Sequence, residues 1–565
     1  MSKEAYRCLI VSDFNAANLV GYLNNDASFD APALTAECAP FGQVRQLLLD
    51  SQAPCRQLPC DLLIVWTTPE GLLEGFRRAL AFEPVGTEEL LAEVDAFADL
   101  ILQAAEWAGC ILLPTWTLPG FHRGFGMLDW RPGTGIVERL ARMNLRLAER
   151  IAGKNQIFML DAGRWLGNAG RFACSPKLWH MGKIPFSHEV FQSAAADVRA
   201  AFAGIKGQAR KLIVLDLDDT LWGGIVGDVG WENLQLGGHD PVGEAHAEFQ
   251  RELKALTRRG IVLGIVSKND EAVAMEAIRK HPEMVLKETD FAGWRINWKD
   301  KAGNLAELVS DLNLGLQSVV FIDDNPMERA RVKETFPEVL VPDWPEDRLL
   351  YRKTLLEMHC FDTPSIGDED QQRTEMYVAD RKRKDLQGTV GSLQDWLHSL
   401  DMRVSIAPMK KDNLQRTAQL LNKTNQMNLS TRRLTESELA AWGSKEGNAI
   451  WTLRVSDRFG DAGLTGIVSV SQQGDVLHLV DFILSCRVFG RQIEQLMLQV
   501  AVSEASRRKC KEVWANYLPT AKNKPTLEFL EQSGMDRAGG DTLFRWPVER
   551  ECHVPSHLHV EVWVA

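Results

Sequence analysis

The chain has 565 residues, of which 45% are hydrophobic and 25% are charged. This ordinary globular composition excludes a mainly disordered, collagen-like or coiled-coil protein, and the length predicts three or four domains. The formal net charge, 64 − 76 = −12, argues against a general binder of nucleic acid or of anionic membranes.

The ten cysteines include no C-x-x-C pair, so the sequence predicts neither a zinc module nor a disulfide framework. The first residues are polar with no apolar segment behind them, and the apolar runs at 62–66 and 110–114 are too short to span a bilayer. We therefore expect a cytoplasmic protein that binds neither nucleic acid nor a membrane.

Residues 1–195 favour a first α/β domain. Apolar runs at 7–12, 62–67 and 110–114 predict strands, and apolar residues at helical spacing predict helices at 88–109 and 132–152. Strands that alternate with helices in this way are typical of a parallel sheet.

Residues 196–365 favour a second α/β domain, with strands expected at 211–216, 262–267, 284–286 and 318–322. A linker and a charged helix are expected over 366–400. A third domain is expected over 401–550, with strands at 403–407, 449–455, 463–472, 476–484 and 512–517 and helices at 412–421 and 490–508. The tail at 551–565 has no predicted role, and the fold class is a three-domain α/β chain.

The second domain begins with two acids at the tip of an apolar strand. Asp216 and Asp218 belong to the pattern D-x-D-x-T, and both carboxylates can face one pocket once the strand ends. Ser267 ends another apolar strand, where its hydroxyl can hold a phosphate oxygen.

Two further motifs follow in the same domain. Lys301 lies 22 residues before Asp323, since 323 − 301 = 22, and supplies a positive charge to a phosphate and to a carboxylate nucleophile. Lys299 is a nearby alternative for this role. Asp323 and Asp324 end the apolar run 319–322 and offer the hard oxygen ligands that Mg²⁺ prefers.

Together these four motifs resemble the haloacid dehalogenase (HAD) phosphatase superfamily over residues 210–345. The resemblance implies a Rossmann-like domain in which Asp216 forms an aspartyl-phosphate and Asp218 is the general acid and base. It also implies that the phosphate is contacted by Thr220, Ser267 and Lys301. The implied Mg²⁺ ligands are Asp216, Asp218 (through its carbonyl), Asp323 and Asp324. The Gly-rich segment 221–236 predicts a hairpin flap, a small cap that leaves room for a substrate carried by a protein.

Several longer segments narrow the resemblance to the FkbH-like proteins, over nearly the whole chain. These segments are 216–228, 321–329, 421–433, 485–491 and 517–523. The resemblance implies a HAD domain joined to a GNAT-like α+β domain. It also implies a reaction in which a glyceryl unit is taken from 1,3-bisphosphoglycerate, dephosphorylated and loaded onto a discrete acyl carrier protein for polyketide-type biosynthesis.

The third domain offers candidates for acyl transfer. Segment 485–491 lies before a predicted helix, whose N-terminal N–H groups can bind the pyrophosphate of a phosphopantetheine-type carrier or of coenzyme A. The acetyltransferase pattern R/Q-x-x-G-x-G/A is met at Arg487 and Gly490 but not at Gln492, which argues against ordinary acetyl-CoA use.

Within the same segment, Cys486 beside Arg487 is a candidate nucleophile toward an acyl phosphate, with a buried packing cysteine as the alternative. The expected contacts to the acyl group or carrier arm are Asn422, Asn425, Gln426, Arg487, Gly490, Arg491 and Asn516. The alternative for the amide-rich residues is that they stabilise loops.

For the first domain, the resemblance implies a fold like that of SGNH hydrolases. The active enzymes carry Gly-Asp-Ser after the first strand, whereas this chain has Ser12, Asp13 and Phe14. Phe14 cannot act as a nucleophile, so we expect no hydrolase activity, with Ser12 as a displaced nucleophile as the alternative. We also expect no catalytic role for His180 or His188. This domain is expected to dock a partner or to support the HAD domain.

Three functions are compatible with these residues. The first is phosphoryl chemistry combined with glyceryl transfer to a carrier protein. The second is a HAD phosphatase fused to an N-acyltransferase that acts on a sugar or amino-acid precursor. The third is a non-catalytic scaffold that docks a carrier. Because carrier proteins are usually acidic, docking one requires a local basic patch, for which 381–384 and 432–433 are candidates.

Overall fold

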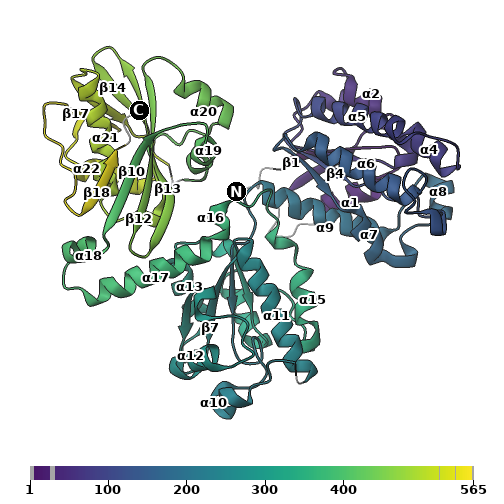
Figure 1. The fold of residues 1–565 in the computed structure, drawn as a ribbon, viewed down its shortest axis with the longest axis horizontal. Helices are drawn as coiled ribbons and strands as arrows, with labels where there is room; N and C mark the ends of the chain where they lie inside the picture. Colours follow the sequence, from purple (N-terminus) through teal and green to yellow (C-terminus); the bar gives the residue numbers. More distant parts are fainter. Residues whose placement is uncertain are drawn as a thin grey trace. The chain divides into compact units, whose positions relative to one another are not determined.

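The structure is a computed structural model that describes residues 5–25, 32–238, 240–424, 426–520, 522–540 and 542–562. The chain divides into two compact units, Met1–Ile213 with Leu316–Ile366 and Val214–Gly315 with Gly367–Ala565, and the boundary passes through strand β6. Each sheet is therefore described by itself, and the domain boundaries expected from the sequence stay a prediction. The expected α/β class is confirmed (Figure 1).

The first sheet has five strands in the order β2-β1-β3-β4-β5, and every neighbouring pair is parallel. Its strands are β1 (Tyr6–Ser12), β2 (Leu34–Cys38), β3 (Leu62–Trp66), β4 (Ile111–Pro114) and β5 (Ile157–Leu160). The helices of this part are α1 (Ala17–Asn25), α2 (Val44–Leu49), α3 (Pro69–Leu72), α4 (Glu74–Leu80), α5 (Thr87–Ala104), α6 (Ile136–Ile151), α7 (Ala162–Ala169), α8 (Pro176–Gly182) and α9 (His188–Ile205).

Both faces of the inner strands β1, β3 and β4 are buried, which is why these strands are nearly continuous apolar runs. Along β1, Leu9 and Val11 pack into the core formed with α5 and α6. Cys8 and Ile10 point to the other face and pack into the core formed with α1, α7 and α9. The sheet is therefore covered by helices on both sides, with its carboxyl edge left to the loops (Figure 1).

The second sheet has the strand order β8-β7-β6-β9. Its strands are β6 (Leu212–Leu215), β7 (Val262–Ser267), β8 (Phe291–Ile296) and β9 (Val319–Ile322). The helices of this region are α10 (Val226–Val229), α11 (Pro241–Arg258), α12 (Glu271–Lys280), α13 (Lys301–Asp311), α14 (Pro326–Thr335) and α15 (Tyr351–Leu356). The linker region contains α16 (Asp368–Gln371), α17 (Arg373–Thr389) and α18 (Leu393–Ser399).

The strand expected at 284–286 is wrong, and β8 takes its place in the sheet. Met284 and Leu286 are buried, but they lie in an irregular segment. The Gln250 side-chain oxygen accepts hydrogen bonds from Val285 N at 3.0 Å and from Leu286 N at 3.1 Å. The Gln250 side chain thus satisfies the backbone N–H groups that, in a strand, would bind the neighbouring strand.

The third sheet is mixed and has nine strands, in the order β16-β17-β15-β14-β13-β12-β10-β18 with β11 added to β14. Its strands are β10 (Met402–Pro408), β11 (Met427–Asn428), β12 (Asn448–Asp457), β13 (Gly460–Gln473), β14 (Val476–Leu484), β15 (Glu512–Asn516), β16 (Asp536–Gly539), β17 (Leu543–Pro547) and β18 (Leu558–Val562). Its helices are α19 (Leu414–Lys423), α20 (Glu436–Gly443), α21 (Ile493–Arg507) and α22 (Lys524–Gln532).

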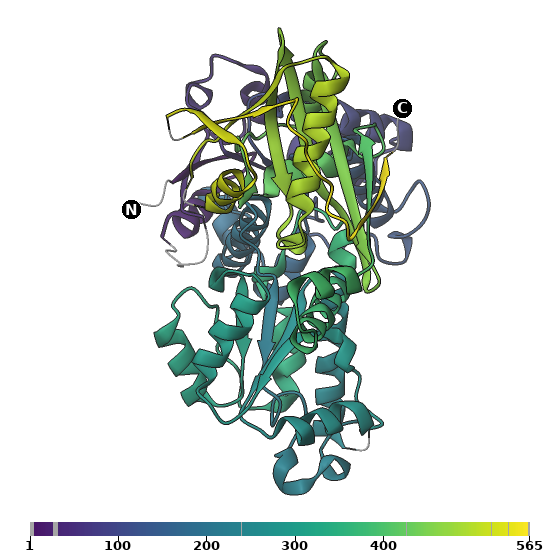
Figure 2. The same cartoon turned by 90° about the vertical axis from the view of Figure 1, so that its left-hand side faces the viewer.

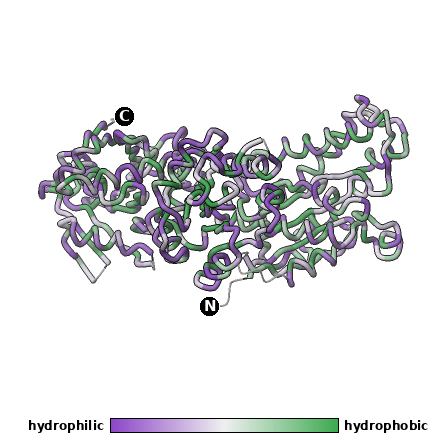
Figure 3. Tube along the Cα trace, turned by 90° about the horizontal axis from the view of Figure 1, so that it is seen from below, coloured by the Kyte–Doolittle hydropathy of each residue, from purple (hydrophilic) through white to green (hydrophobic). Residues whose placement is uncertain are grey.

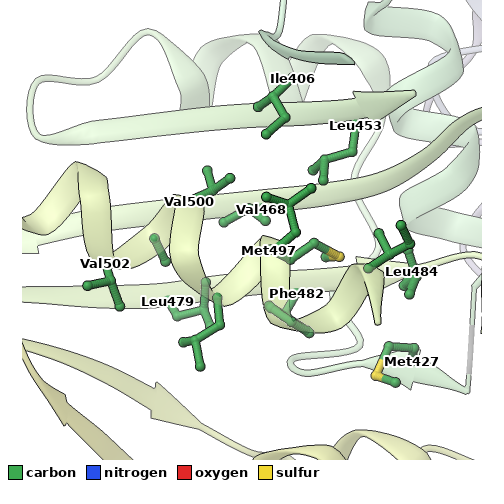
Figure 4. Packing of buried hydrophobic residues seen from close by; sticks show 14 of the residues in the cluster. Ile406, Met427, Leu453, Val468, Leu479, Phe482, Leu484, Met497, Val500 and Val502 are labelled. Atoms are coloured by element: carbon green, nitrogen blue, oxygen red, sulfur yellow. The ribbon is translucent and has the colours of Figure 1, made fainter. Parts of the chain in front are cut away.

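Helix α21 lies across one face of this sheet (Figure 2). Its Met497 and Val500 pack against Val468, Leu479 and Phe482 of β13 and β14 (Figure 4). The other face packs against α19 and α20. The tail without a predicted role contributes β18, which pairs in parallel with β10. Hydrophobic and hydrophilic segments alternate along the coloured part of the trace, as expected for layered α/β domains (Figure 3).

Candidate functional site

The carboxylate of Asp216 lies at the tip of β6, directly after four fully buried residues. Its Oδ2 is 2.9 Å from Nζ of Lys301, and both side chains are buried. Lys301 is the first residue of α13, whose N-cap Asp300 accepts a hydrogen bond from Gly303 N at 3.1 Å. Lys299 is exposed, so the structure places Lys301 and not Lys299 against Asp216.

The second oxygen of Asp216, Oδ1, is buried and has no hydrogen-bond partner among the described residues. A buried polar atom without a partner is rare in a folded protein and requires an explanation. One carboxylate oxygen from each of Asp216, Asp323 and Asp324 lies within 4.8 Å of the others. Carboxylate oxygens that close together are the donor set that Mg²⁺ takes, so these residues fit a divalent cation.

Backbone contacts hold the two acids after β9. Asp323 Oδ1 accepts a hydrogen bond at 2.9 Å from the backbone N of Asn325, the N-cap residue of α14. The Arg329 guanidinium donates to the carbonyl oxygens of Asp323 at 2.7 Å and of Asp324 at 2.6 Å. These hydrogen bonds to main-chain groups therefore hold the turn that carries Asp323 and Asp324.

Asp218 contacts the flap and not the acidic group. Its Oδ1 accepts hydrogen bonds from Trp222 Nε1 at 2.9 Å and from Val226 N at 3.0 Å. Its Oδ2 accepts from Asn269 Nδ2 at 2.8 Å. Burial raises the pKa of the Asp218 carboxyl above its usual range, although the hydrogen bonds from Val226 and Trp222 oppose this shift. Such a group holds a proton more readily than a surface aspartate.

The flap expected at 221–236 is closed by one antiparallel residue pair. Gly223 and Gln235 exchange main-chain hydrogen bonds at 3.0 and 2.9 Å, and α10 lies between them. It is thus a short helical loop and not a regular hairpin. Asp219, at φ 54°, turns the chain into it and accepts a hydrogen bond from Gly224 N at 2.9 Å.

Two phosphate-binding candidates are buried beside this loop. The side chains of Thr220 and Ser267 are 0% and 1% exposed. Ser267 is the last residue of β7, and its carbonyl accepts a hydrogen bond from Asn297 N at 3.1 Å. The Thr220 carbonyl lies 3.2 Å from Nδ1 of His246 on α11.

Sequence reasoning missed Asn269 and Trp222, which contact Asp218 directly. Both stand close to recognised motifs: Asn269 follows Ser267 by two residues, and Trp222 follows Thr220 by two. An amide or an indole N–H that close to a strand end can reach a neighbouring carboxylate. That proximity was the available signal.

In the third sheet, three segments singled out in the sequence meet at the end of β14. Met427 and Asn428 of β11 pair with Leu484 and Ile483 of β14, and segment 485–491 follows directly. Asn523, fully buried, donates through Nδ2 to the Asn428 carbonyl at 3.0 Å. The segments 421–433, 485–491 and 517–523 are therefore neighbours in space.

Several of the acyl-arm candidates have contacts within the fold. Asn422 exchanges two hydrogen bonds with the main chain of Leu434, at 2.8 and 3.1 Å, as in a side chain that stabilises a loop. Gln426 and Asn516 are exposed. Gly490 has φ 72° and precedes α21. Asn425 lies outside the described residues, as does the side chain of Cys486.

Arg491 is buried in an ion-pair group. Its Nη2 lies 3.1 Å from Asp380 Oδ1, and its Nη1 lies 3.4 Å from Asp457 Oδ2. Arg383 reaches the same Asp457 carboxylate at 2.6 and 2.8 Å. Arg487 donates to the Ala462 carbonyl at 3.5 Å. The Arg491 guanidinium thus fastens α17 to β12 and is held by acceptors of the protein itself.

Sequence reasoning also missed a buried acid in the third sheet, Asp481. Asp481 on β14 is 0% exposed and accepts hydrogen bonds from Ser430 Oγ at 2.9 Å and from Arg432 Nε at 3.0 Å. Ser469 Oγ on β13 also donates to it. The Arg432 guanidinium lies 4.5 Å from the centre of the Trp442 ring. This group ties the segment around 430 to the centre of the sheet.

The arginines of the basic segments proposed for docking have contacts within the fold. Arg432 is bound to Asp481, and Arg433 donates to the Leu421 carbonyl at 2.7 Å. Arg383 is buried, and the Arg381 guanidinium stacks 4.1 Å from the Trp294 ring. These arginines are held within the fold, whereas Lys382 and Lys384 of the same segment are exposed, so docking at these segments stays a prediction.

In the first domain, Phe14 is buried and packs edge-to-face on Trp66 and Phe186. Asp13 accepts hydrogen bonds from Thr68, from N at 2.9 Å and from Oγ1 at 2.5 Å. The hydroxyl of Ser12 accepts one from Phe14 N at 3.1 Å. His180 and His188 are exposed. The position that carries the nucleophile in active SGNH enzymes is thus part of the hydrophobic core.

None of the helices in the described ranges combines the length and apolar character needed to cross a membrane. No family profile and no curated protein matches the chain.

Among solved structures, the chain is similar to the N-terminal part of the protein BF1531 from Bacteroides fragilis, which contains a phosphatase domain and was crystallised in complex with Mg. The TM-score is 0.59 and the identity 28%, over 65% of this chain and 96% of that chain. It is also similar, at a TM-score of 0.21, to the ribosomal-protein-S18-alanine N-acetyltransferase from Escherichia coli, with 12% identity over 26% of this chain and 94% of that chain. An acetyltransferase of the GNAT family from Staphylococcus aureus matches at a TM-score of 0.21 and 6% identity, over 26% of this chain and 99% of that chain.

Proposed function

We propose that this chain is a Mg²⁺-dependent phosphotransferase of the HAD type, with Asp216 as the residue that takes the phosphoryl group. The observation that carries the proposal is the Asp216 carboxylate, which has one oxygen on the Lys301 ammonium and the other buried without a hydrogen-bond partner among the described residues. The similarity to a Mg-complexed structure that contains a phosphatase domain supports it.

The proposed reaction has two steps. Asp216 attacks the phosphorus, the bond from phosphorus to the leaving oxygen breaks, and Asp218 gives its proton to that oxygen. Water then attacks the aspartyl-phosphate, Asp218 takes the proton, and inorganic phosphate leaves while Asp216 is regenerated. The raised pKa of Asp218 suits the first step, because it favours the protonated acid.

The charges around the phosphoryl group follow from the residues present. Lys301 balances the negative charge of Asp216 as an anionic phosphate approaches. Mg²⁺, when bound by Asp216, Asp323 and Asp324, supplies neutralisation of the charge on the phosphoryl oxygens. Ser267 and Thr220 hold phosphate oxygens in this proposal.

We propose further that the substrate is a phosphorylated glycerate, 1,3-bisphosphoglycerate, and that the glyceryl unit is loaded onto the phosphopantetheine thiol of an acyl carrier protein. What supports this finer proposal is the resemblance to FkbH-like proteins, whose three characteristic segments in the last domain are neighbours in space. In the acyl step, the Cys486 thiolate attacks the acyl carbonyl and the bond to the phosphate oxygen breaks. The carrier thiolate then displaces Cys486.

The test is to incubate the full chain with Mg²⁺, enzymatically generated 1,3-bisphosphoglycerate and a holo carrier protein, and to weigh both proteins by mass spectrometry. We expect phosphate release and a glyceryl adduct on the carrier. The acyl step itself releases one phosphate, so Asp216 is tested by the phosphate that remains on the glyceryl unit. Asp216→Asn should give an adduct that still carries this phosphate, whereas Asp412→Asn, an exposed aspartate, should give the same glyceryl adduct as the wild type. A phosphate-free glyceryl adduct formed by Asp216→Asn would contradict the first proposal.

The second proposal has its own readout. A carrier adduct that persists in Cys486→Ala would contradict the role of that cysteine but not the phosphoryl chemistry. Turnover of acetyl-CoA onto an amine, without any adduct on the carrier, would favour the alternative of an N-acyltransferase fused to a phosphatase.

A further inference from the structure

Two neighbouring loops extend from the carboxyl edge of the first sheet. Residues 120–135 lie between β4 and α6, and residues 170–183 lie between α7 and α9. Strands β4 and β5, which lead into these loops, are paired in parallel. A Cβ on Gly120 would lie 2.1 Å from Sγ of Cys174, so the two loops touch. We call residues 120–135 and 170–183 the loop pair.

The loop pair holds a concentration of exposed apolar side chains. Of the 23 large apolar side chains that are exposed in the part of the chain the structure describes, seven lie here: Phe121, Met127, Leu128, Trp130, Phe172, Leu178 and Met181. Met127 is fully exposed, Met181 is 76% exposed and Trp130 is 68% exposed. Single exposed apolar residues are normal, but a concentration of them marks a surface that binds something.

The first of the two loops has a defined conformation that presents these side chains. Asp129 Oδ1 accepts a hydrogen bond from Phe125 N at 2.6 Å, and the Asp129 carbonyl accepts one from Glu138 N at 3.0 Å. A Cβ on Gly135 would lie 2.2 Å from that carbonyl oxygen, which makes glycine necessary there. The Phe125 ring packs edge-to-face on Phe82 at 5.1 Å. A loop organised in advance loses less entropy when it binds.

The charge of the loop pair is opposite to that of the chain. Five exposed cations lie within it: Arg123, Arg131, Arg171, Lys177 and Lys183. Its single carboxylate is Asp129, so its formal charge is 5 − 1 = +4, against −12 for the whole chain. The Arg171 guanidinium lies 4.7 Å from the Phe172 ring and the Lys183 ammonium 5.0 Å from the Trp179 ring. Apolar and cationic groups are thus interleaved.

We infer that the loop pair is a docking surface for a small acidic protein that presents an apolar helix face; on the proposed function, this is the acyl carrier protein. Exposed Trp and Met supply the apolar contact, and the surrounding Arg and Lys match an acidic rim. The chain's net charge of −12 opposes adsorption to an anionic bilayer. A two-fold contact between two copies would place the same cations against one another.

The test measures binding of a holo acyl carrier protein to the full chain by isothermal titration calorimetry. We expect Trp130→Ala to weaken the Kd about 10-fold, in the range of an interface anchor. Arg123→Glu combined with Lys177→Glu should weaken it by about the same factor and reduce its dependence on salt. The matched controls are Leu58→Ala and Lys154→Glu, both exposed and placed before β3 and β5 at the opposite edge of the sheet.

Three results would overturn the inference. One is an unchanged Kd in the loop-pair variants. Another is binding of the wild-type chain to vesicles of phosphatidylcholine and phosphatidylglycerol that is lost in Trp130→Ala. The third is a dimer in sedimentation velocity that these variants dissociate. Phosphate release from p-nitrophenyl phosphate, which needs no carrier, is measured in parallel. Its loss in Asp216→Asn tests the proposed function, whereas the loop-pair variants should retain it.

Discussion

Asn269 donates a hydrogen bond through Nδ2 to Oδ2 of Asp218 at 2.8 Å, and its amide orientation is fixed because its own oxygen accepts from Asp270 N at 3.0 Å. The other oxygen of Asp218, Oδ1, already accepts two hydrogen bonds, from Trp222 and Val226. A carboxylate oxygen offers about two acceptor positions. A proton on Asp218 is therefore confined to the remaining position of Oδ2, which gives the proposed acid a defined direction.

This relationship predicts the effect of Asn269→Leu. Loss of a donor to the carboxylate removes a contact that favours the ionised form, so the pKa of Asp218, which burial already raises, should rise further. The alkaline limb of kcat/KM, which reports the protonated acid, should move to higher pH, and kcat should fall about 10- to 100-fold. Asn168→Leu, on the exposed side of α7, is the control. A fall in kcat with an unmoved limb would mean that Asn269 acts only on stability.

The acidic group predicts binding of Mg²⁺. Because the ion binds the folded chain, it should stabilise it by about 2.7 kcal/mol when its concentration is 100 times the Kd. This stabilisation raises the melting temperature, and differential scanning calorimetry with and without excess EDTA measures the rise. Asp323→Asn should remove the Mg²⁺-dependent shift, whereas Asp412→Asn should keep it. The same shift in both variants would place the ion at another site.

The sequence was sufficient for the strands and motifs that depend on local pattern. The apolar runs before Asp216, Ser267 and Asp323 became β6, β7 and β9, because a buried parallel strand has few alternatives to a continuous apolar run. It failed at β8, because the apolar residues 284–286 are buried in a loop whose donors bind Gln250, 35 residues away. Local pattern carries no information about such a partner.

The same limit applies to the candidate sites. The D-x-D-x-T spacing located Asp218, but its contacts with Asn269 lie across 51 residues of sequence. Arg383 and Arg432 looked like surface charge in the sequence, whereas tertiary packing pairs them with Asp457 and Asp481. Conversely, the cations of the loop pair are scattered over 123–183 and become one surface only because β4 and β5 are neighbours.

Glu70 predicts a pH dependence of stability. Burial, with a contribution from the charge of Asp13, raises the pKa of Glu70 from 4.5 to about 7. Between these values the unfolded chain has lost the proton that the folded chain still holds, so stability falls as pH rises through this window. The loss should reach about 2–3 kcal/mol above pH 7. Glu70→Gln, which stays neutral, should melt higher than wild type at pH 8 and equally at pH 4.5. If the difference in melting temperature between Glu70→Gln and the wild type were the same at pH 8 and at pH 4.5, the raised pKa of Glu70 would be contradicted.

The ion pairs around Asp457 predict that removing a buried carboxylate lowers the free energy of unfolding much more than removing an exposed one. Asp457 accepts from Arg383 and lies within 3.4 Å of Arg491, and both arginines are buried. Asp457→Asn leaves two buried guanidinium groups without this charge and should cost about 3–5 kcal/mol. Asp461 pairs with Arg454 at the surface of the same sheet, with side chains 45% and 64% exposed, so Asp461→Asn should cost less than about 1 kcal/mol.

Chemical denaturation measures this difference in the free energy of unfolding. Hydrogen exchange of β12, which contains Asp457, and of α21, which begins two residues after Arg491, then locates it. Arg491→Leu combined with Asp457→Asn should recover part of the loss, since the double variant leaves fewer unpaired charges buried. If the two single aspartate variants were equally destabilised, the buried pairs would contribute no more than a surface contact. The role of Arg491 would then have to be sought at the end of β14.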